Sequence, residues 1–241
     1  MLPSSPQRAL ITGASSGIGA ATALALAQAG INLVLVGRNQ EKLAQVAAKA
    51  IALGVKAPTF SLDLADIPNV KAEITKVLDQ VGPVQILINS AGIAQTAPLA
   101  EMSLEDWQAI INLNVTSIWQ CTQALIPSLR SQRCGTIINV VSIAGQQVFS
   151  NWGAYCTSKF ALMGFTKTLA AEERQHGIRV IALCPGAVDT PIWDQGTIVG
   201  NFDRTSMLSP ESVAQSILYA IQLPPQALVE ELVLMPLGGT L

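Results

Sequence analysis

Charged residues, aromatic residues and cysteines are all scarce in this sequence. Of the 241 residues, 12% are Asp, Glu, Lys or Arg, 5% are Phe, Trp or Tyr, and the net charge is only −2. Such a chain has no basic field that would attract the phosphates of nucleic acid or of an anionic membrane. We therefore expect no nucleic-acid partner.

Long uninterrupted hydrophobic runs are also missing. The most apolar stretch, residues 20–36, is interrupted by Thr22, Gln28, Gly30 and Asn32. It falls short of the roughly 20 apolar residues that a membrane-spanning helix needs. Residues 1–8 show no charged region followed by an apolar one, so we expect no secretory signal. These absences favour a cytoplasmic protein that does not act at a membrane.

The few cysteines carry no metal or disulfide signature. They are scattered along the chain without CxxC spacing, at Cys121, Cys134, Cys156 and Cys184. Free, buried thiols in a reducing cytosol are the simplest account of such a pattern. We expect neither disulfides nor a bound metal.

What the chain does have is an alternation of apolar runs and helical periodicity. Half of its residues are hydrophobic, as in a parallel sheet whose strands are covered on both faces. The expected strands are residues 9–12, 32–36, 57–62, 85–89, 135–141, 179–184 and 231–235. The expected helices are residues 17–29, 40–53, 69–81, 104–130 and 154–176. This order predicts an α/β fold, a Rossmann-type doubly wound parallel sheet of about seven strands with helices on both faces.

No repeat, linker or low-complexity tract divides the chain, so we expect one domain over residues 1–241. The least regular stretch is residues 185–209, which contains Pro, Gly and Trp193. A loop that long inside a compact domain is usually functional, and we expect it to act as a lid.

A glycine-rich turn follows the first expected strand. Residues 12–19 are Thr-Gly-Ala-Ser-Ser-Gly-Ile-Gly, and a helical pattern begins there. Glycines at positions 13, 17 and 19 allow the turn to close and allow backbone N–H groups to approach a pyrophosphate. The positive end of the following helix favours the same anion. A structural glycine turn is the alternative, but the strand–turn–helix context favours dinucleotide binding.

The residue after the second expected strand indicates which dinucleotide the chain binds. Enzymes that use NAD commonly place an acidic residue about 20 residues after the glycines, where it binds the ribose hydroxyls. This chain has Arg38 at that place. A guanidinium binds a 2′-phosphate, which a carboxylate would repel. We therefore predict NADP(H), with a solvated loop arginine as the alternative.

Tyr155 and Lys159 have the spacing of neighbours on one helix face. A nearby ammonium favours the phenolate, so we expect the pKa of Tyr155 to be lowered towards working pH. Such a tyrosine can give a proton to a carbonyl oxygen or take one from an alcohol. For the pair taken alone, the alternative is an ordinary Tyr/Lys contact on the surface of an amphipathic helix. Cys156 points elsewhere on the helix, and we assign it to packing.

Together these pieces resemble the short-chain dehydrogenase/reductase family, essentially end to end. The matching segments are residues 12–19, Asn89-Ser90-Ala91-Gly92, Asn114, Ser142, Tyr155 with Lys159, and residues 185–190 (Pro-Gly-Ala-Val-Asp-Thr). Each lies where an open α/β sheet binds ligands, at the carboxyl end of a strand or on the next helix. One departure is Ser90, where the family more often has a second Asn.

The resemblance implies roles that spacing alone does not give. Tyr155 would be the catalytic acid or base, and Lys159 would also hold the nicotinamide ribose. Ser142 would orient the substrate oxygen, and Asn114 would position a water in a proton relay. Asp63 would contact adenine, while Val188 and Thr190 would hold the carboxamide. The predicted cofactor-binding residues are Gly13, Ser15, Ser16, Gly17, Ile18, Gly19, Arg38, Asp63, Asn89, Ala91, Gly92, Tyr155, Lys159, Pro185, Gly186, Val188 and Thr190.

We expect structural roles for the single histidine and for two of the tryptophans. His176 lies at a helix end before Gly177, where a cation is favourable. We expect Trp107 and Trp119 to pack in the core or an interface. Pocket-lining candidates follow the site segments in sequence: Gln95, Gln146, Gln147, Val148, Trp152, Ala187 and Trp193.

The substrate is the least defined feature of the sequence. The expected function is hydride transfer between NADP(H) and a small ketone, keto acid or hydroxy acid. One alternative is a 3-oxoacyl-acyl carrier protein or acetoacetyl-CoA reductase acting on an acyl thioester, with Arg130, Arg133 and Arg174 as a basic rim for the carrier. Against this alternative, the tail at residues 228–241 lacks the Thr-Gly-Gln and Asp-Gly-Gly segments usual in those enzymes.

Two alternatives from other classes remain: a non-catalytic NADP(H)-sensing protein on the same fold, and a membrane-associated protein, which only the hydropathy suggests. The resemblance also implies a homo-oligomer, a tetramer or dimer that pairs the long helices at residues 104–130 and 154–176.

Overall fold

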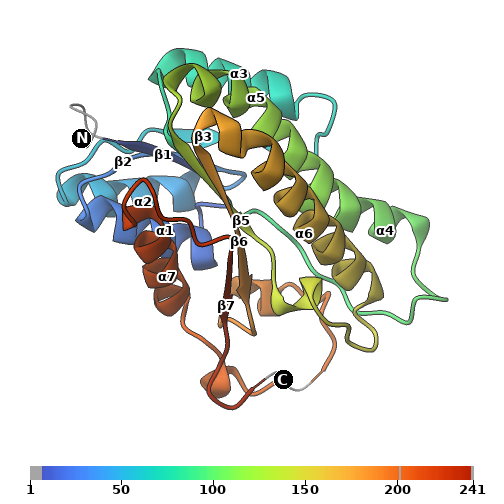
Figure 1. Ribbon diagram of the computed structural model, residues 1–241. Helices are drawn as coiled ribbons and strands as arrows, with labels where there is room; N and C mark the ends of the chain where they lie inside the picture. Colours follow the sequence, from blue (N-terminus) through green and yellow to red (C-terminus); the bar gives the residue numbers. More distant parts are fainter. Residues whose placement is uncertain (1–6, 201, 240–241) are drawn as a thin grey trace.

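A seven-stranded parallel sheet forms the centre of the molecule in the computed structural model, which describes residues 7–200 and 202–239 (Figure 1). The strand order is β3-β2-β1-β4-β5-β6-β7, and every pairing is parallel. The strands are β1 (Arg8–Thr12), β2 (Asn32–Gly37), β3 (Thr59–Ser61), β4 (Ile86–Asn89), β5 (Gly135–Val140), β6 (Ile178–Pro185) and β7 (Glu231–Leu234). The predicted α/β fold with a doubly wound sheet is confirmed.

Helices cover both faces of this sheet (Figure 1). One face carries α1 (Gly17–Gln28), α2 (Gln40–Ala52) and α7 (Pro210–Gln222). The other carries α3 (Val70–Val81), α4 (Leu104–Ile111), α5 (Ser117–Gln132) and α6 (Gly153–Glu173). Within the described residues, no helix is long and apolar enough to cross a membrane.

The strands are apolar on both sides because each side has its own core. In β1, Ala9 and Ile11 pack in the cluster that includes α1 and α2, whereas Leu10 packs in the cluster that includes α3 and α5. All three side chains are fully buried. Alternate residues of a strand point to opposite faces, so a sheet covered twice needs continuous apolar runs. This explains the high hydrophobic content.

The helix predicted over residues 104–130 is interrupted. It consists of α4, a π-helical segment at Asn112–Thr116, and α5. The Ser117 N–H donates to the Asn112 carbonyl, and the Ser117 hydroxyl donates to the Leu113 carbonyl at 2.6 Å. A π segment widens the helix by one residue per turn and is frequent at functional sites. Asn114 lies within it and is fully buried.

Other differences from the predicted elements are small. The strand expected at residues 57–62 is shorter, Thr59–Ser61, and α7 was not among the predicted helices. Cys121, Cys156 and Cys184 are buried as expected, but Cys134 is exposed because it lies in the turn between α5 and β5. Trp119 is 44% exposed on α5 and is therefore not a core residue. His176 lies in the 3₁₀ turn that ends α6, as predicted.

Candidate active site

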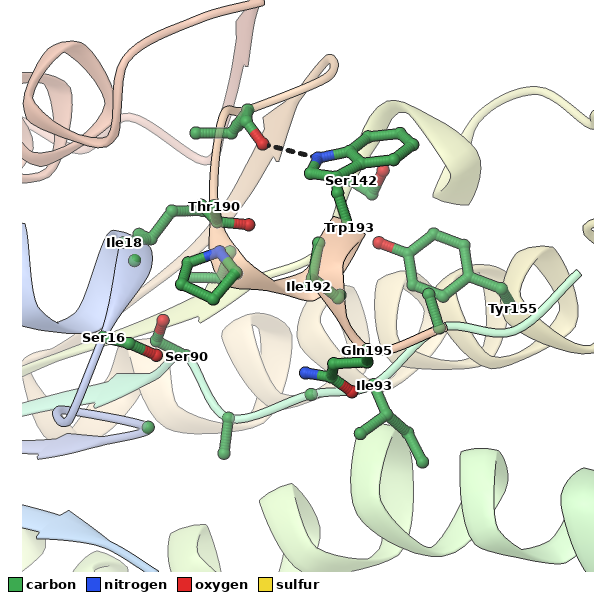
Figure 2. Close-up of a pocket in the computed structure, with 18 of the residues that line it drawn as sticks. Ser16, Ile18, Ser90, Ile93, Ser142, Tyr155, Thr190, Ile192, Trp193 and Gln195 are labelled. Atoms are coloured by element: carbon green, nitrogen blue, oxygen red, sulfur yellow. Dashed lines mark hydrogen bonds between the residues drawn. The ribbon is translucent and has the colours of Figure 1, made fainter. Parts of the chain in front are cut away.

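The carboxyl edge of the sheet carries a cavity of about 690 Å³. Its walls come from the loops after β1 to β6 and from the start of α6. In a doubly wound sheet this edge lies beside the switch point, where the connections from β1 and β4 diverge to opposite faces. Figure 2 shows that residues from distant segments, including Ser16, Ser90, Ser142, Tyr155 and Thr190, surround one space.

The glycine turn after β1 forms one end of the cavity. Gly13 has φ +67°, and a Cβ added there would lie 2.9 Å from the backbone of Ala91. A Cβ added at Gly19 would lie 2.3 Å from the Gly13 carbonyl oxygen. Only glycine therefore allows the turn to close against the start of α1 and the loop after β4.

The start of α1 is suited to an anion. Its N-cap residue, Ser16, lines the cavity and makes no side-chain capping hydrogen bond in the described structure. The N–H groups of the first helical turn have no intrahelical acceptor, and they carry the positive end of the helix dipole. Ser15, Gly17 and Ile18 line the same region. These groups fit a pyrophosphate.

The loops after β1 and β4 are joined by Thr12. Its hydroxyl oxygen accepts hydrogen bonds from the Ser90 N–H at 3.1 Å and the Ala91 N–H at 3.3 Å. Both of those residues and Gly92 line the cavity. The Ser90 position therefore keeps its place in the wall, although the residue differs from the family pattern.

Two cations lie where the loop after β2 meets the cavity. Arg38 and Lys42 both line it, and both are exposed. Asn39, between them, caps α2 by accepting a hydrogen bond from the Lys42 N–H at 2.9 Å. Asp63 lines the neighbouring wall. Lys42 was missed from sequence; its position in the first turn of the helix after Arg38 was the available signal.

Tyr155 and Lys159 lie at the opposite end of the cavity, one helical turn apart on α6. The Lys159 Nζ is 5.6 Å from the centroid of the Tyr155 ring and donates a hydrogen bond to the Val140 carbonyl at 2.9 Å. Ser142, just after β5, faces the same space, and its hydroxyl accepts from the Ala144 N–H at 3.1 Å. Figure 2 shows the Tyr155 hydroxyl directed into the cavity on the side where Ser142 lies.

The expected lowering of the tyrosine pKa is wrong for this protein without its ligands. Burial raises the pKa of Tyr155 to about 12, while the nearby Ser142 hydroxyl acts in the lowering direction. Burial lowers the pKa of Lys159 to about 8. Desolvation penalises the charged form of each group, and this effect exceeds the attraction that the spacing alone predicted. The phenol is therefore a protonated donor near neutral pH.

Asn114 lies behind Tyr155 and Lys159 rather than in the cavity wall. Its Oδ1 accepts from the Ile93 N–H at 2.9 Å, and its Nδ2 donates to the Ile93 carbonyl at 2.9 Å and the Ser158 hydroxyl at 3.0 Å. A Cβ on Gly92 would lie 3.2 Å from Asn114 Oδ1 and 3.9 Å from Lys159 Nζ. The π segment thus brings the amide close to the lysine.

Most predicted cofactor residues line the cavity, but two do not. Gly19 packs against the Gly13 carbonyl, and Asn89 is fully buried beneath the turn. The Asn89 Nδ2 donates to Asn139 Oδ1 at 2.8 Å, which joins β4 to β5. Both residues therefore lie behind the cavity wall and support it. The prediction that they contact the cofactor directly is corrected to this supporting role. Pro185, Gly186, Val188 and Thr190 do line the cavity.

Aromatic side chains enclose the space beside Tyr155. The Trp152 ring centroid is 5.6 Å from that of Tyr155 and 5.9 Å from that of Trp193, both in edge-to-face geometry. Phe202 lies 4.9 Å from Trp193 between centroids. The Trp193 indole N–H donates to the Val188 carbonyl at 2.8 Å, drawn as the dashed line in Figure 2.

The segment that carries Trp193 and Phe202 is fixed to its surroundings by polar contacts. The Thr96 N–H donates to the Thr197 carbonyl at 2.9 Å, and the Thr197 hydroxyl donates to the Ala94 carbonyl at 2.7 Å. Arg204 forms ion pairs with Asp189 and Asp194. The irregular stretch predicted from sequence therefore forms one wall of the cavity, and its opening as a lid stays a prediction.

The predicted substrate-pocket residues divide into two groups. Trp152, Ala187 and Trp193 line the cavity, whereas Gln95, Gln146, Gln147 and Val148 do not. Val148 is 75% exposed. Sequence reasoning missed other apolar wall residues, among them Ile93, Phe149, Ile192, Ile198 and Phe202. They lie in loops without periodicity, so only the fold identifies them.

The basic rim proposed for a carrier protein lies at the wrong edge. Arg130 and Arg133 directly precede β5, and Arg174 directly precedes β6, so all three lie at the amino edge of the sheet. Arg130 pairs with the buried carboxylate of Glu173, and Arg174 pairs with Glu230. None of them lines the cavity. The prediction is therefore wrong for these arginines as a rim of the cavity mouth.

Comparison with known proteins agrees with this geometry. The family model described as "short chain dehydrogenase" matches residues 7–197. A 3-oxoacyl-[acyl-carrier-protein] reductase of Thermotoga maritima is 36% identical, covering 87% of this chain and 88% of its own. An uncharacterized oxidoreductase of Staphylococcus saprophyticus is 35% identical over 95% of this chain and 96% of its own. An alcohol dehydrogenase from Thermococcus sibiricus, solved with 5-hydroxy-NADP, has a TM-score of 0.88 at 30% identity, with 97% of each chain covered.

Proposed function

The chain belongs to the short-chain dehydrogenase family, and from that premise we propose that it transfers a hydride between NADP(H) and the carbonyl or alcohol carbon of a small ketone, keto acid or hydroxy acid. The observation that carries the proposal is a single cavity with a phosphate-binding turn at one end and the Ser142, Tyr155 and Lys159 side chains at the other. Membership in this family of oxidoreductases makes the protein a dehydrogenase or reductase and argues against a non-catalytic sensor.

The residues at the phosphate end favour NADP(H) as the cofactor. Arg38 and Lys42 stand together where the 2′-phosphate of an adenine ribose would lie. A fork-shaped guanidinium and an ammonium both favour that dianion over a free hydroxyl. When bound, NADPH supplies the hydride and becomes NADP⁺. The Thermococcus enzyme was solved with an NADP derivative.

The chain's own residues move the proton. Tyr155 carries its proton near neutral pH because burial raises its pKa to about 12, so it is ready to protonate a carbonyl oxygen as the hydride arrives. Ser142 holds that oxygen beside the phenol. Lys159 stabilises the phenolate left behind, since opposite charges attract strongly in a buried site. Asn114 fixes the loop at Ile93, and its Oδ1 and the Lys159 Nζ both lie within 4 Å of the place that a Cβ on Gly92 would occupy, which favours a role in a proton relay.

A second candidate is the reduction of a 3-oxoacyl thioester. The 36% identity to a 3-oxoacyl-[acyl-carrier-protein] reductase favours it. The placement of Arg130, Arg133 and Arg174 at the far edge of the sheet removes the carrier-docking argument that the sequence had offered.

NADPH oxidation against a substrate panel tests both candidates. The panel contains simple ketones, keto acids, acetoacetyl-CoA and a 3-oxoacyl carrier protein, and absorbance of NADPH reports turnover. We expect the highest kcat/KM with a ketone or keto acid. Preference for the carrier-bound thioester would favour the second candidate, and no turnover of any carbonyl compound would contradict both.

We also propose that the protein works as a homo-oligomer, a tetramer or dimer. Leu104 on α4, Trp119 on α5 and Phe160 on α6 are all exposed, which leaves apolar surface on this side of the molecule. Sedimentation of the purified protein tests this; a single monomeric species at micromolar concentration would contradict it.

A further inference from the structure

We infer that the substrate is an uncharged ketone whose carbonyl carries a planar, apolar substituent, most simply an aryl group. The inference rests on the proposed function and narrows it. It comes from the difference in chemistry between the two ends of the cavity, and from a cluster of Trp152, Trp193 and Phe202 that meets the catalytic tyrosine through Trp152.

Apart from Lys159, charge is confined to one part of the cavity. Within the described residues, the charged side chains in its lining are Arg38, Lys42, Asp63 and Lys159. The first three lie at the phosphate end, in the loop after β2, the first turn of α2 and the loop after β3. Lys159 is buried and already donates to the Val140 carbonyl. The residues outside the description (1–6, 201, 240 and 241) include no Lys, Arg or His.

The arginine that follows the wall segment, Arg204, is engaged elsewhere. Arg204 bonds Asp189 and Asp194, and its remaining terminal nitrogen donates to the Thr190 carbonyl at 3.2 Å. It does not line the cavity. A substrate carboxylate placed beside Tyr155 would lose its hydration, while the lysine of this end, Lys159, is already committed to the Val140 carbonyl and to the tyrosine itself. Burying a charge without a partner of its own is strongly unfavourable. The site therefore selects against the ionised keto acids of the proposed set.

The walls beside Tyr155 favour a flat ring. Trp152 meets the Tyr155 ring at an interplanar angle of 67° and the Trp193 ring at 66°, and Phe202 meets Trp152 at 74°. Aromatic rings prefer such edge-to-face contacts, so an added ring in this space finds partners of matching geometry. Ile192 and Phe149 supply further apolar wall.

The polar groups of this end are few and neutral. The indole N–H of Trp193 is used by the Val188 carbonyl, so that ring offers the substrate an apolar surface. Gln195 and Ser150 remain in the lining, and Figure 2 shows the Gln195 amide in the close-up of the cavity. An amide can bond a neutral ester or carbonyl oxygen, but it cannot neutralise a carboxylate. On an aryl ketone, the hydride joins the carbonyl carbon and the Tyr155 proton joins the oxygen, which gives a secondary alcohol.

The first experiment compares two α-keto compounds with the same phenyl ring and ketone, one with a neutral ester group and one with a charged carboxylate. Ethyl benzoylformate is neutral, whereas benzoylformate is ionised at neutral pH. With NADPH, we expect kcat/KM for the ester to exceed that for the acid at least 100-fold. Equal or faster reduction of benzoylformate would overturn this inference and leave the proposed function standing. If NADPH binds but no ketone is reduced, the proposed function fails and the inference fails with it.

The second experiment tests the planar preference. Acetophenone and cyclohexyl methyl ketone are similar in size, but only the first is flat. The ratio of their kcat/KM values should fall at least fivefold in Trp152→Leu and in Phe202→Leu. Because a ratio is measured, a general loss of activity through the Tyr155 contact does not affect it. The matched control is Tyr219→Leu, which removes an aromatic ring that is 58% exposed on α7. An unchanged ratio in both pocket variants would overturn the inference.

Discussion

The two ends of the cavity are built in different ways. At the phosphate end, the site that suits a pyrophosphate is mainly backbone: a glycine turn closed so tightly that a Cβ at Gly19 would lie 2.3 Å from a carbonyl oxygen. The catalytic end consists of side chains, namely Tyr155, Lys159 and Ser142, which depend on burial and on a wall of aromatic rings. A backbone site is specified by a few local residues, whereas a side-chain site depends on everything packed around it.

The largest expected loss of activity comes from a substitution at the catalytic end alone. Tyr155→Phe removes the proton donor and keeps the ring against Trp152. We expect kcat/KM to fall about 1000-fold, the range of general acid catalysis. NADPH affinity, measured by fluorescence titration, should change little because the glycine turn is untouched. Near-normal turnover would refute the role of Tyr155, and Tyr219→Phe on exposed α7 serves as the control.

The next effect concerns the buried ammonium group of Lys159 and the free energy of unfolding. The pKa of Lys159 is about 8 in the folded protein against an ordinary value of 10.5, so between these pH values the unfolded chain binds a proton that the native state has lost. Stability due to this group must therefore rise with pH across that window, by about 3 kcal/mol in total. Urea unfolding of wild type and Lys159→Met between pH 7.5 and 10.5 measures it.

The difference in unfolding free energy between these two proteins should increase in favour of wild type as pH rises. Lys49→Met, which removes an exposed lysine on α2, should show no such trend relative to wild type. A pH-independent difference for Lys159→Met would mean that Lys159 is not desolvated as the structure indicates.

The third effect concerns the phosphate end. Arg38→Ala should lower kcat/KM for NADPH about 30-fold through loss of a charge-assisted contact, while kcat/KM for NADH stays nearly the same. Arg174→Ala, an exposed arginine at the opposite edge of the sheet, is the matched control. A wild-type enzyme that prefers NADH would contradict the assignment of Arg38.

The smallest effect is expected at the wall segment. Arg204→Gln breaks the contacts to Asp189 and Asp194, which are exposed ion pairs and contribute little individually. We expect kcat/KM to fall by less than about fivefold, mainly through a higher KM for the ketone. A much larger loss in kcat would show that Arg204 positions Thr190 and Trp193 for the chemistry.

This contrast also explains how far the sequence could predict the structure. The sheet, the glycine turn, Arg38 and the Tyr155–Lys159 spacing all follow from short local patterns, and the structure brings them to one cavity. α7 was missed although Ser209 caps it and Pro210 opens it, which is a recognisable start signal. The start of α7 is therefore encoded in a local sequence signal.

Other features could not be predicted from local patterns. The π segment at Asn112–Thr116 contains no proline, glycine or cap that would separate it from the α-helix on either side, so no local signal marks the wider turn. The direction of the Tyr155 pKa shift depends on the walls that exclude water. Phe149, Ile192 and Phe202 reach the cavity only because loops after different strands converge on it.

The pair formed by Trp152 and Trp193 has an optical consequence. Two indoles 5.9 Å apart and inclined at 66° are close enough for their strong ultraviolet transitions to couple, which gives a pair of circular-dichroism bands of opposite sign. The coupling disappears once the rings separate. Because one ring belongs to the start of α6 and the other to the segment after β6, the intensity of those bands would report, without any label, how closely the two stay together during a catalytic cycle.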